Sequence, residues 1–120
     1  MTEPKIVEKE WGEEQWIVNR EYCGKRLLLK QGYRSSLHCH RIKDETFYLM
    51  AGTMKVEVGT DPEDLEVREL TKGDILHLAP NTWHRFTGLT DVEFMEFSTH
   101  HDDEDSIRLT QSERVPEEEA

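Results

Sequence analysis

Short runs in which hydrophobic and polar residues alternate fill most of the chain, and this pattern predicts β-strands. The run 54–58 is an example, because its first, third and fifth residues are apolar and the two between them are charged. Such alternation buries one face of a strand and exposes the other. Runs of four to six residues, a usual length for strands, occur at 15–18, 26–30, 37–40, 46–50, 54–58, 66–70, 75–78, 84–87 and 92–97.

The segments between these runs contain residues that favour turns. Gly32, the pair Ala51-Gly52 and the triplet Lys72-Gly73-Asp74 are examples. No window of twelve or more residues has the spacing of apolar positions that a packed helix requires. Many short strands with turns between them are typical of a β-sandwich or a β-barrel. The sequence therefore predicts a single all-β domain.

The length of the chain sets the boundaries of this domain. A chain of 120 residues builds one hydrophobic core rather than two. We expect residues 11–110 to form the β-barrel, preceded by an N-terminal arm or edge strand at 1–10. Residues 111–120 are an acidic C-terminal tail, which we expect to fray.

The charge of the chain argues against several kinds of partner. Acidic side chains outnumber basic ones by 26 to 15, for a net charge of -11. Nucleic acids and anionic membranes are bound through basic surfaces, so we expect neither. No apolar run has the length of a membrane span, and the N-terminal segment has no secretory signal. We therefore expect a cytoplasmic protein in which Cys23 and Cys39 are free thiols.

The histidines are the most informative polar residues. His38 and His40 lie two apart in an expected strand, so both imidazoles lie on one face. Two neutral imidazoles on a rigid strand suit a transition metal. Glu45 follows a polar turn and His84 begins a later strand, and a barrel could bring all four to one interior point. A single strand histidine is more often a surface or core residue than a ligand, and we expect His100 and His101, after the last strand, to be surface residues.

The spacing of these residues resembles the two sequence motifs of the cupin family. The first motif reads Gly32-x5-His38-x-His40-x4-Glu45-x6-Gly52 and matches the family pattern at every position. The second runs from Gly73 through His84 to Gly88, with Ala79 in place of a proline, Asn81 in place of a glycine and Gly88 in place of an asparagine. Asn81 is a mild exchange, because asparagine tolerates the left-handed conformation of such a turn.

This resemblance implies a jelly-roll barrel, the cupin double-stranded β-helix, with one divalent metal inside it. Carried over by motif position, the implied ligands are His38, His40, Glu45 and His84. Three imidazoles and one carboxylate suit Mn, Fe, Co, Ni or Zn better than Ca or Mg. Cupins often form homodimers through a sheet face, and the stretch 27–29 is a candidate for that face.

Flanking residues resemble the small sugar-isomerase cupins. The stretch 10–14 with Trp11-Gly12 resembles the opening of the mannose-6-phosphate isomerase type II cupins, and Lys43 occupies a position similar to a lysine of D-lyxose isomerase-like cupins. The resemblance implies a sugar or sugar-phosphate isomerase or epimerase that uses the metal to stabilise an enediolate. We expect Glu96 and Lys43 to be the acid/base residues. The expected substrate-binding residues, which could equally be surface or core residues, are Arg34, Tyr48, His77 and Arg85.

Two other functions are compatible with the same residues. An Fe- or Ni-dependent cupin dioxygenase could use the same three histidines and glutamate. A non-catalytic cupin could bind a carbohydrate or sugar nucleotide in the barrel. The isomerase hypothesis predicts a small carbohydrate as the partner, and the dioxygenase hypothesis predicts a mostly apolar pocket without a cation.

Overall fold

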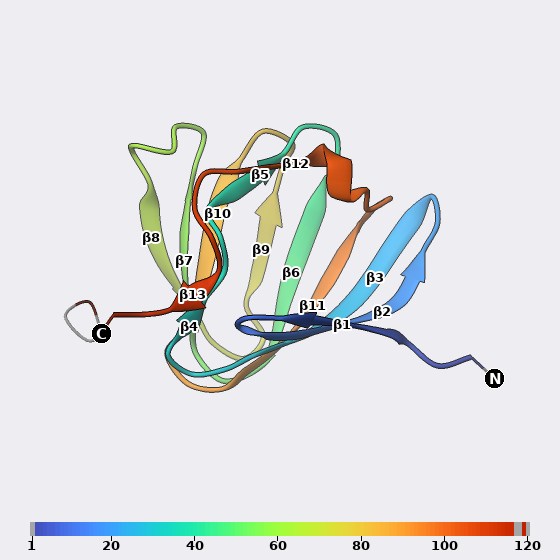
Figure 1. Ribbon diagram of the computed structural model, residues 1–120, viewed down its shortest axis with the longest axis horizontal. Coiled ribbons are helices and arrows are strands. Elements are labelled where there is room, and N and C mark those ends of the chain that lie inside the picture. The colour runs from blue at the N-terminus through green and yellow to red at the C-terminus, as the bar shows by residue number, and fades with distance from the viewer. Residues whose placement is uncertain (1, 117–118, 120) are drawn as a thin grey trace.

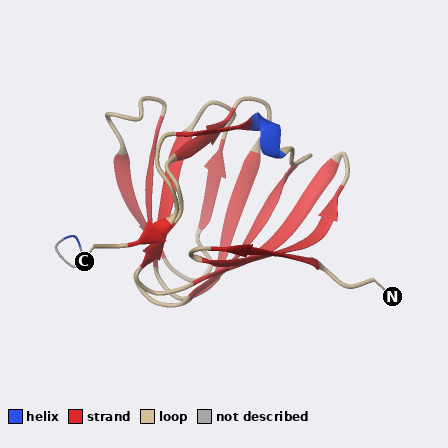
Figure 2. Cartoon of the chain, viewed as in Figure 1, coloured by secondary structure: helices blue, strands red, loops and turns tan. Residues whose placement is uncertain are grey.

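Two facing antiparallel β-sheets form the protein, and the predicted all-β, jelly-roll class is confirmed (Figures 1 and 2). The computed structural model describes residues 2–116 and 119. The first sheet has six strands, in the order β1 (Lys5–Lys9), β2 (Gly12–Asn19), β3 (Tyr22–Leu29), β11 (Val92–Thr99), β6 (Glu45–Ala51) and β9 (Ile75–Leu78). The second sheet has seven, namely β12 (Ser106–Arg108), β5 (His38–His40), β10 (Trp83–Gly88), β4 (Tyr33–Arg34), β13 (Glu113–Arg114), β7 (Met54–Gly59) and β8 (Glu66–Leu70).

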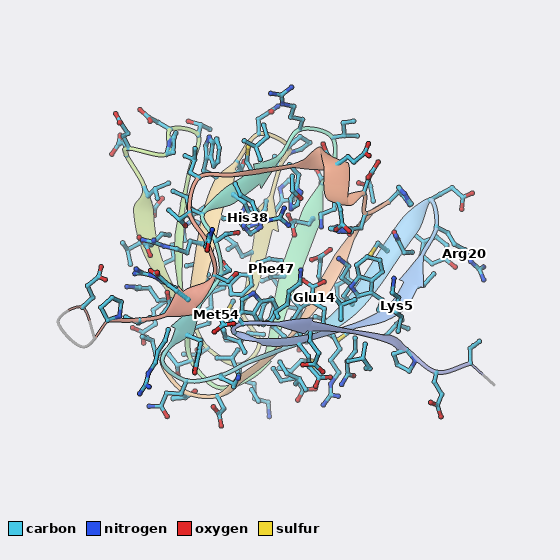
Figure 3. All side chains as sticks on the ribbon, viewed as in Figure 1. Lys5, Glu14, Arg20, His38, Phe47 and Met54 are labelled. Carbon is cyan, nitrogen blue, oxygen red and sulfur yellow. The ribbon has the colours of Figure 1, made fainter. Side chains whose placement is uncertain are left out.

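The apolar positions of the alternating runs meet between the two sheets. Leu27, Leu49 and Phe94 from the first sheet pack with Met54 and Val56 from the second, and all five are buried. In Figure 3 the labelled side chains of Phe47 and Met54 lie in the interior, below His38. The core therefore fills one part of the barrel and leaves the part near His38 for polar side chains.

The two ends of the chain add strands to this barrel. The segment Lys5–Lys9 pairs with β2 along its whole length, so it is an edge strand rather than a loose arm. Within the acidic tail, Glu113 and Arg114 pair with β4. The tail therefore contributes a short strand to the second sheet. Residue 1 and residues 117, 118 and 120 lie outside the described residues.

A strand that the sequence did not predict closes the barrel beside the histidines. A short 3-10 helix at Asp103–Asp105 leads into β12, which pairs antiparallel with β5. The register places Ser106 opposite His40 and Arg108 opposite His38. The chain after the last predicted strand thus returns to pair with the strand that carries His38 and His40.

Of the three residues 27–29 that were a candidate dimer face, only Leu28 is partly exposed. Leu27 and Leu29 are each 2% exposed and belong to the core, because alternate residues of β3 point inward. Exposed apolar side chains lie elsewhere on the same sheet, for example Ile75 and Phe97. Homodimer formation stays a prediction. Among the described residues, no helix has both the length and the apolar character that crossing a membrane requires.

Candidate metal centre

Three histidines converge inside the barrel from two neighbouring strands. His38 and His40 alternate on β5, and the β5–β10 register places His84 directly opposite His38. The ring centroids of His38 and His84 are 4.3 Å apart, and those of His38 and His40 are 5.3 Å apart. One ligand atom from each ring lies within 4.8 Å of the others. This set could hold one metal ion.

Glu45 approaches the same point from the opposite sheet. Its Oε2 atom lies 3.3 Å from Nε2 of His40 and 3.6 Å from Nε2 of His84. The carboxylate is buried, as are both imidazoles. The structure therefore groups the three predicted histidine ligands from β5 and β10, and it places Glu45 of β6 beside two of them, His40 and His84.

The outer nitrogen of each ring has its own hydrogen-bond partner. Nδ1 of His38 lies 2.8 Å from the carbonyl oxygen of Ser36, and Nδ1 of His84 lies 3.1 Å from that of Thr82. Nδ1 of His40 lies 3.2 Å from Oγ of Ser106 on β12. A ring that donates from Nδ1 to a carbonyl has its lone pair on Nε2. These contacts orient the rings with Nε2 available to a metal.

A turn in the second motif fixes the position of His84. Asn81 has a φ of 65°, and its backbone N–H donates to the carbonyl oxygen of His40 at 2.7 Å. Asparagine is one of the residues that tolerates this left-handed region. The backbone bond ties the start of β10 to β5, and this holds the two histidine-bearing strands together.

Burial keeps the imidazoles neutral. It lowers the pKa of His40 to about 3 with help from Lys43, and it lowers the pKa of His84 to about 4. Burial also lowers the pKa of His38 well below its usual value. Neutral imidazoles are the form that binds metals. Nε2 of His84 is buried and has no hydrogen-bond partner among the described residues, an arrangement that fits a metal ligand.

The electrostatics of Glu45 fit a cation as well. Burial raises the pKa of Glu45 well above its usual value, and the neighbouring carboxylate of Glu96 raises it further. A buried carboxylate gains most from a positive charge beside it. Three neutral imidazoles and one such carboxylate match the donor set of a transition metal.

A buried ion pair lies next to this centre. Nζ of Lys43 is 3.0 Å from Oε2 of Glu96 and 3.8 Å from Oε1 of Glu45. Burial alone raises the pKa of Glu96, but the ammonium groups of Lys43 and Lys25 outweigh it and lower the pKa to about 2. Burial lowers the pKa of Lys43, whereas Glu96 and Glu45 raise it above its ordinary value. Both residues are therefore charged.

The loop before Glu45 is held so that Lys43 points inward. The carboxylate of Asp105 accepts hydrogen bonds from the backbone N–H groups of Arg41, Ile42 and Lys43, the last at 2.9 Å. The Lys43 side chain is 2% exposed, whereas Ile42 is 79% exposed. The acidic run after the last strand thus positions a predicted catalytic residue.

The four predicted substrate-binding residues lie outside the cavity that the histidines line. Arg34 pairs with Glu113, and Arg85 pairs with Glu57 at 2.8 Å. His77 is an exposed residue paired with Asp44, and Tyr48 is also partly exposed. Arg85 follows His84, which points inward, and Tyr48 lies between the core residues Phe47 and Leu49. Strand alternation therefore turns both of these side chains outward.

The cavity has a volume of about 70 Å³ and contains residues that the sequence reasoning missed. Lys25, Glu14 and Trp16 line it or border it, and His101 is a wall residue rather than a surface residue. Nδ1 of His101 lies 3.0 Å from Nζ of Lys43. The alternation of Lys25 with Leu27 and Leu29 could have revealed the first of these, had the predicted strand started one residue earlier.

Comparison with known proteins identifies the family. The family model described as the cupin domain matches residues 26–98 of the 120. The chain belongs to the cupin family. No curated protein matches the chain. The mannose-6-phosphate isomerase and D-lyxose isomerase likeness thus finds no support in these matches.

Solved cupin structures share the fold. Oxalate decarboxylase from Bacillus subtilis at pH 4.6 superposes with a TM-score of 0.78 at 16% sequence identity, covering 88% of this chain and 30% of that chain. A structure of the same Bacillus subtilis enzyme, described for its Mn(II) centres, gives a TM-score of 0.77 at 16% identity with the same coverage. At this identity the likeness shows the fold alone, and the chain spans under a third of the length of these neighbours.

Proposed function

We propose that the protein is a metal-dependent cupin enzyme that isomerises or epimerises a small hydroxy-carbonyl compound. The observation that carries this proposal is the buried Lys43–Glu96 ion pair beside the histidine cluster. A buried ion pair rarely stabilises a protein more than apolar residues of the same volume would. Charged residues in a cavity beside metal-ligand residues are therefore candidates for chemistry.

The residues of the cavity divide this chemistry among themselves. A divalent transition metal held by His38, His40, Glu45 and His84 would polarise the carbonyl and hydroxyl oxygens of a substrate. Glu96 would accept the proton from the neighbouring carbon, and its Oε2 is oriented by hydrogen bonds from Lys43 and Ser98 at 3.0 Å each. The ammonium of Lys43 keeps Glu96 ionised and would return a proton to substrate oxygen.

The cavity favours a short, unphosphorylated substrate. Its volume is about 70 Å³, whereas a cavity needs roughly 10–15 Å³ on this measure to hold one water. Arg34 and Arg85, two of the residues predicted to bind substrate, pair with acidic side chains outside the cavity. The resemblance of Trp11 and Lys43 to sugar-isomerase cupins supports the isomerase class but not the phosphorylated substrates.

A second candidate is the decarboxylation or oxidation of a small carboxylate. The solved neighbours are described as oxalate decarboxylase, and one description names Mn(II) centres. The small volume of the cavity and its lysines favour this candidate. Manganese is therefore the first metal to test for either reaction.

Solvent exchange separates the two candidates. The protein loaded with Mn, Fe, Co, Ni or Zn is incubated in D2O with short aldoses, ketoses and hydroxy acids, and deuterium incorporation at carbon is measured by NMR. We expect incorporation that Glu96→Gln abolishes without loss of metal. The matched control is Glu93→Gln on the same strand, whose carboxylate pairs with Arg26 away from the cavity. Release of CO2 from oxalate without any exchange would favour the second candidate.

A further inference from the structure

Lys25 is a buried cation that the proposed chemistry does not use. It lies on β3 between Trp16 of β2 and Glu96 of β11, which are its register partners. Its side chain is 1% exposed, and it lines the same cavity as the histidines. Lysine is almost never buried to this degree unless its ammonium is paired.

The protein satisfies the Lys25 ammonium only in part. Nζ lies 3.4 Å from Oε1 of Glu14 and 4.3 Å from the centroid of the Trp16 ring. The same Oε1 accepts a shorter hydrogen bond, 2.8 Å, from Nε1 of Trp16. A lysine ammonium has three donors, and here one long hydrogen bond and one aromatic face engage it. The remaining donors can bind an anion in the cavity.

The charges around the cavity point to the same ligand. The lining contains four cations and four carboxylates, which are Lys9, Lys25, Lys43, Arg108, Glu14, Glu45, Glu96 and Asp103. This balance stands out in a chain with a net charge of -11. A divalent ion at the histidines would give the cavity a net charge of about +2. A small anion would then offset part of this positive charge in a site of low dielectric constant.

We propose that Lys25 binds the carboxylate of a short hydroxy- or keto-acid whose other oxygens face the metal-ligand residues. This inference rests on the proposed function and adds a carboxylate to its substrate. The aromatic face of Trp16 and the carboxylate of Glu14 fix the ammonium in place, so the lysine loses little freedom on binding. Lys25 is thus the residue that selects acids over neutral analogues.

Binding of two ligands of equal size tests the role of Lys25. The Mn(II)-loaded protein is titrated by calorimetry with glycolate and with its neutral analogue glycolamide. We expect tighter binding of glycolate, and we expect Lys25→Met to weaken it roughly 10- to 100-fold, the effect of one hydrogen bond to a charged group. Glycolamide affinity and bound manganese should not change. Lys72→Met, which removes a cation from an exposed turn, is the matched control.

A second variant guards against a folding defect. Lys25→Met alone leaves Glu14 without its cation, whereas the double variant Glu14→Gln, Lys25→Met removes both charges and keeps an acceptor for Trp16. Unchanged glycolate affinity in the double variant, or an equal loss for both ligands, would overturn the proposal. So would a wild-type protein without preference for glycolate. Any of these results together with deuterium exchange that depends on Glu96 would leave the proposed function standing.

Discussion

The interior of the barrel has two layers that the same strands build, one apolar and one charged. On β3 the apolar layer contains Leu27 and the charged layer contains Lys25, two residues away. On β11 the corresponding pair is Phe94 and Glu96. The exposed fractions are 2% and 1% in the first pair and 0% and 4% in the second. The two layers are therefore equally buried, and they differ only in chemistry.

This difference separates stability from function within one core. Burial of apolar side chains stabilises the barrel at about 25 cal/mol for each Å² removed from water. Burial of a charge costs free energy unless partners compensate it. Leucine and phenylalanine at the positions of the charged layer would stabilise the fold at least as well. Its residues are accordingly the ones that we assign to metal and substrate.

Removal of one candidate metal-binding histidine should give the largest effect, a loss of metal affinity, and should leave the apolar layer unchanged. We expect His84→Ala to lower metal affinity by more than 100-fold, since loss of an outer hydrogen-bond partner alone costs about 10- to 100-fold. Metal content after dialysis against a chelator measures this. His77→Ala, on an exposed histidine, should keep its metal. Full occupancy in His84→Ala would show that this histidine is not a ligand.

The matching change in the apolar layer should affect stability and spare the metal. Phe94→Ala leaves a cavity among Phe47, Phe86 and Leu49, and phenylalanine truncations in cores cost about 3–5 kcal/mol. Urea unfolding measures the loss, and metal content of the folded fraction should stay at the wild-type level. Phe97→Ala on the same strand, where the side chain is 53% exposed, should cost far less. Equal losses for both variants would contradict the two-layer description.

Acid should destabilise the metal-free protein through the charged layer. The loss for each histidine should be smaller than the loss from Phe94→Ala. The pKa of His40 falls from 6.5 to about 3 and that of His84 from 6.5 to about 4 on folding. Between these values only the unfolded chain binds the protons, so the free energy of unfolding decreases as the pH falls below 6.5. At pH 5 each histidine should cost about 2 kcal/mol. Denaturant unfolding from pH 7 to pH 5 measures the loss.

Glu45 acts in the opposite direction and provides the control. Its pKa is raised on folding, so the folded state retains a proton above the ordinary pKa of a glutamate, and this contribution grows as the pH falls. Glu45→Gln should therefore make the acid-induced loss steeper. Stability that stays constant from pH 7 to pH 5 in this variant would show that the histidines do not remain neutral on folding.

The sequence predicted the parts of the site that follow from local rules. Strand alternation placed His38 and His40 on one face, and motif spacing added Glu45 and His84, which the structure brings together. Arg85, the residue after His84, was predicted to bind substrate beside the metal site. It cannot do so, because consecutive residues of a strand point to opposite sides of the sheet. Applied to the sequence alone, the same rule could have excluded Arg85 from the predicted site.

Other parts depended on contacts between distant segments. His101 was expected at the surface, yet its ring lies against Lys43 because Asn19 accepts a hydrogen bond from its backbone N–H at 2.8 Å. Strand β12 was not predicted, yet it provides Ser106 beside His40. Lys25 was missed because the predicted strand began at residue 26, one residue after it. Its burial depends on Glu14 and Trp16, which are on another strand.

The amino-acid sequence by itself determined the all-β class, the family and the candidate ligand set, because alternation and motif spacing are properties of short stretches of chain. Only the tertiary structure decided which partner each buried charge has, since these charges are buried only where a group from another segment compensates them. The pairing of Lys43 with Glu96 joins residues 53 apart in the chain. No local pattern contains that information.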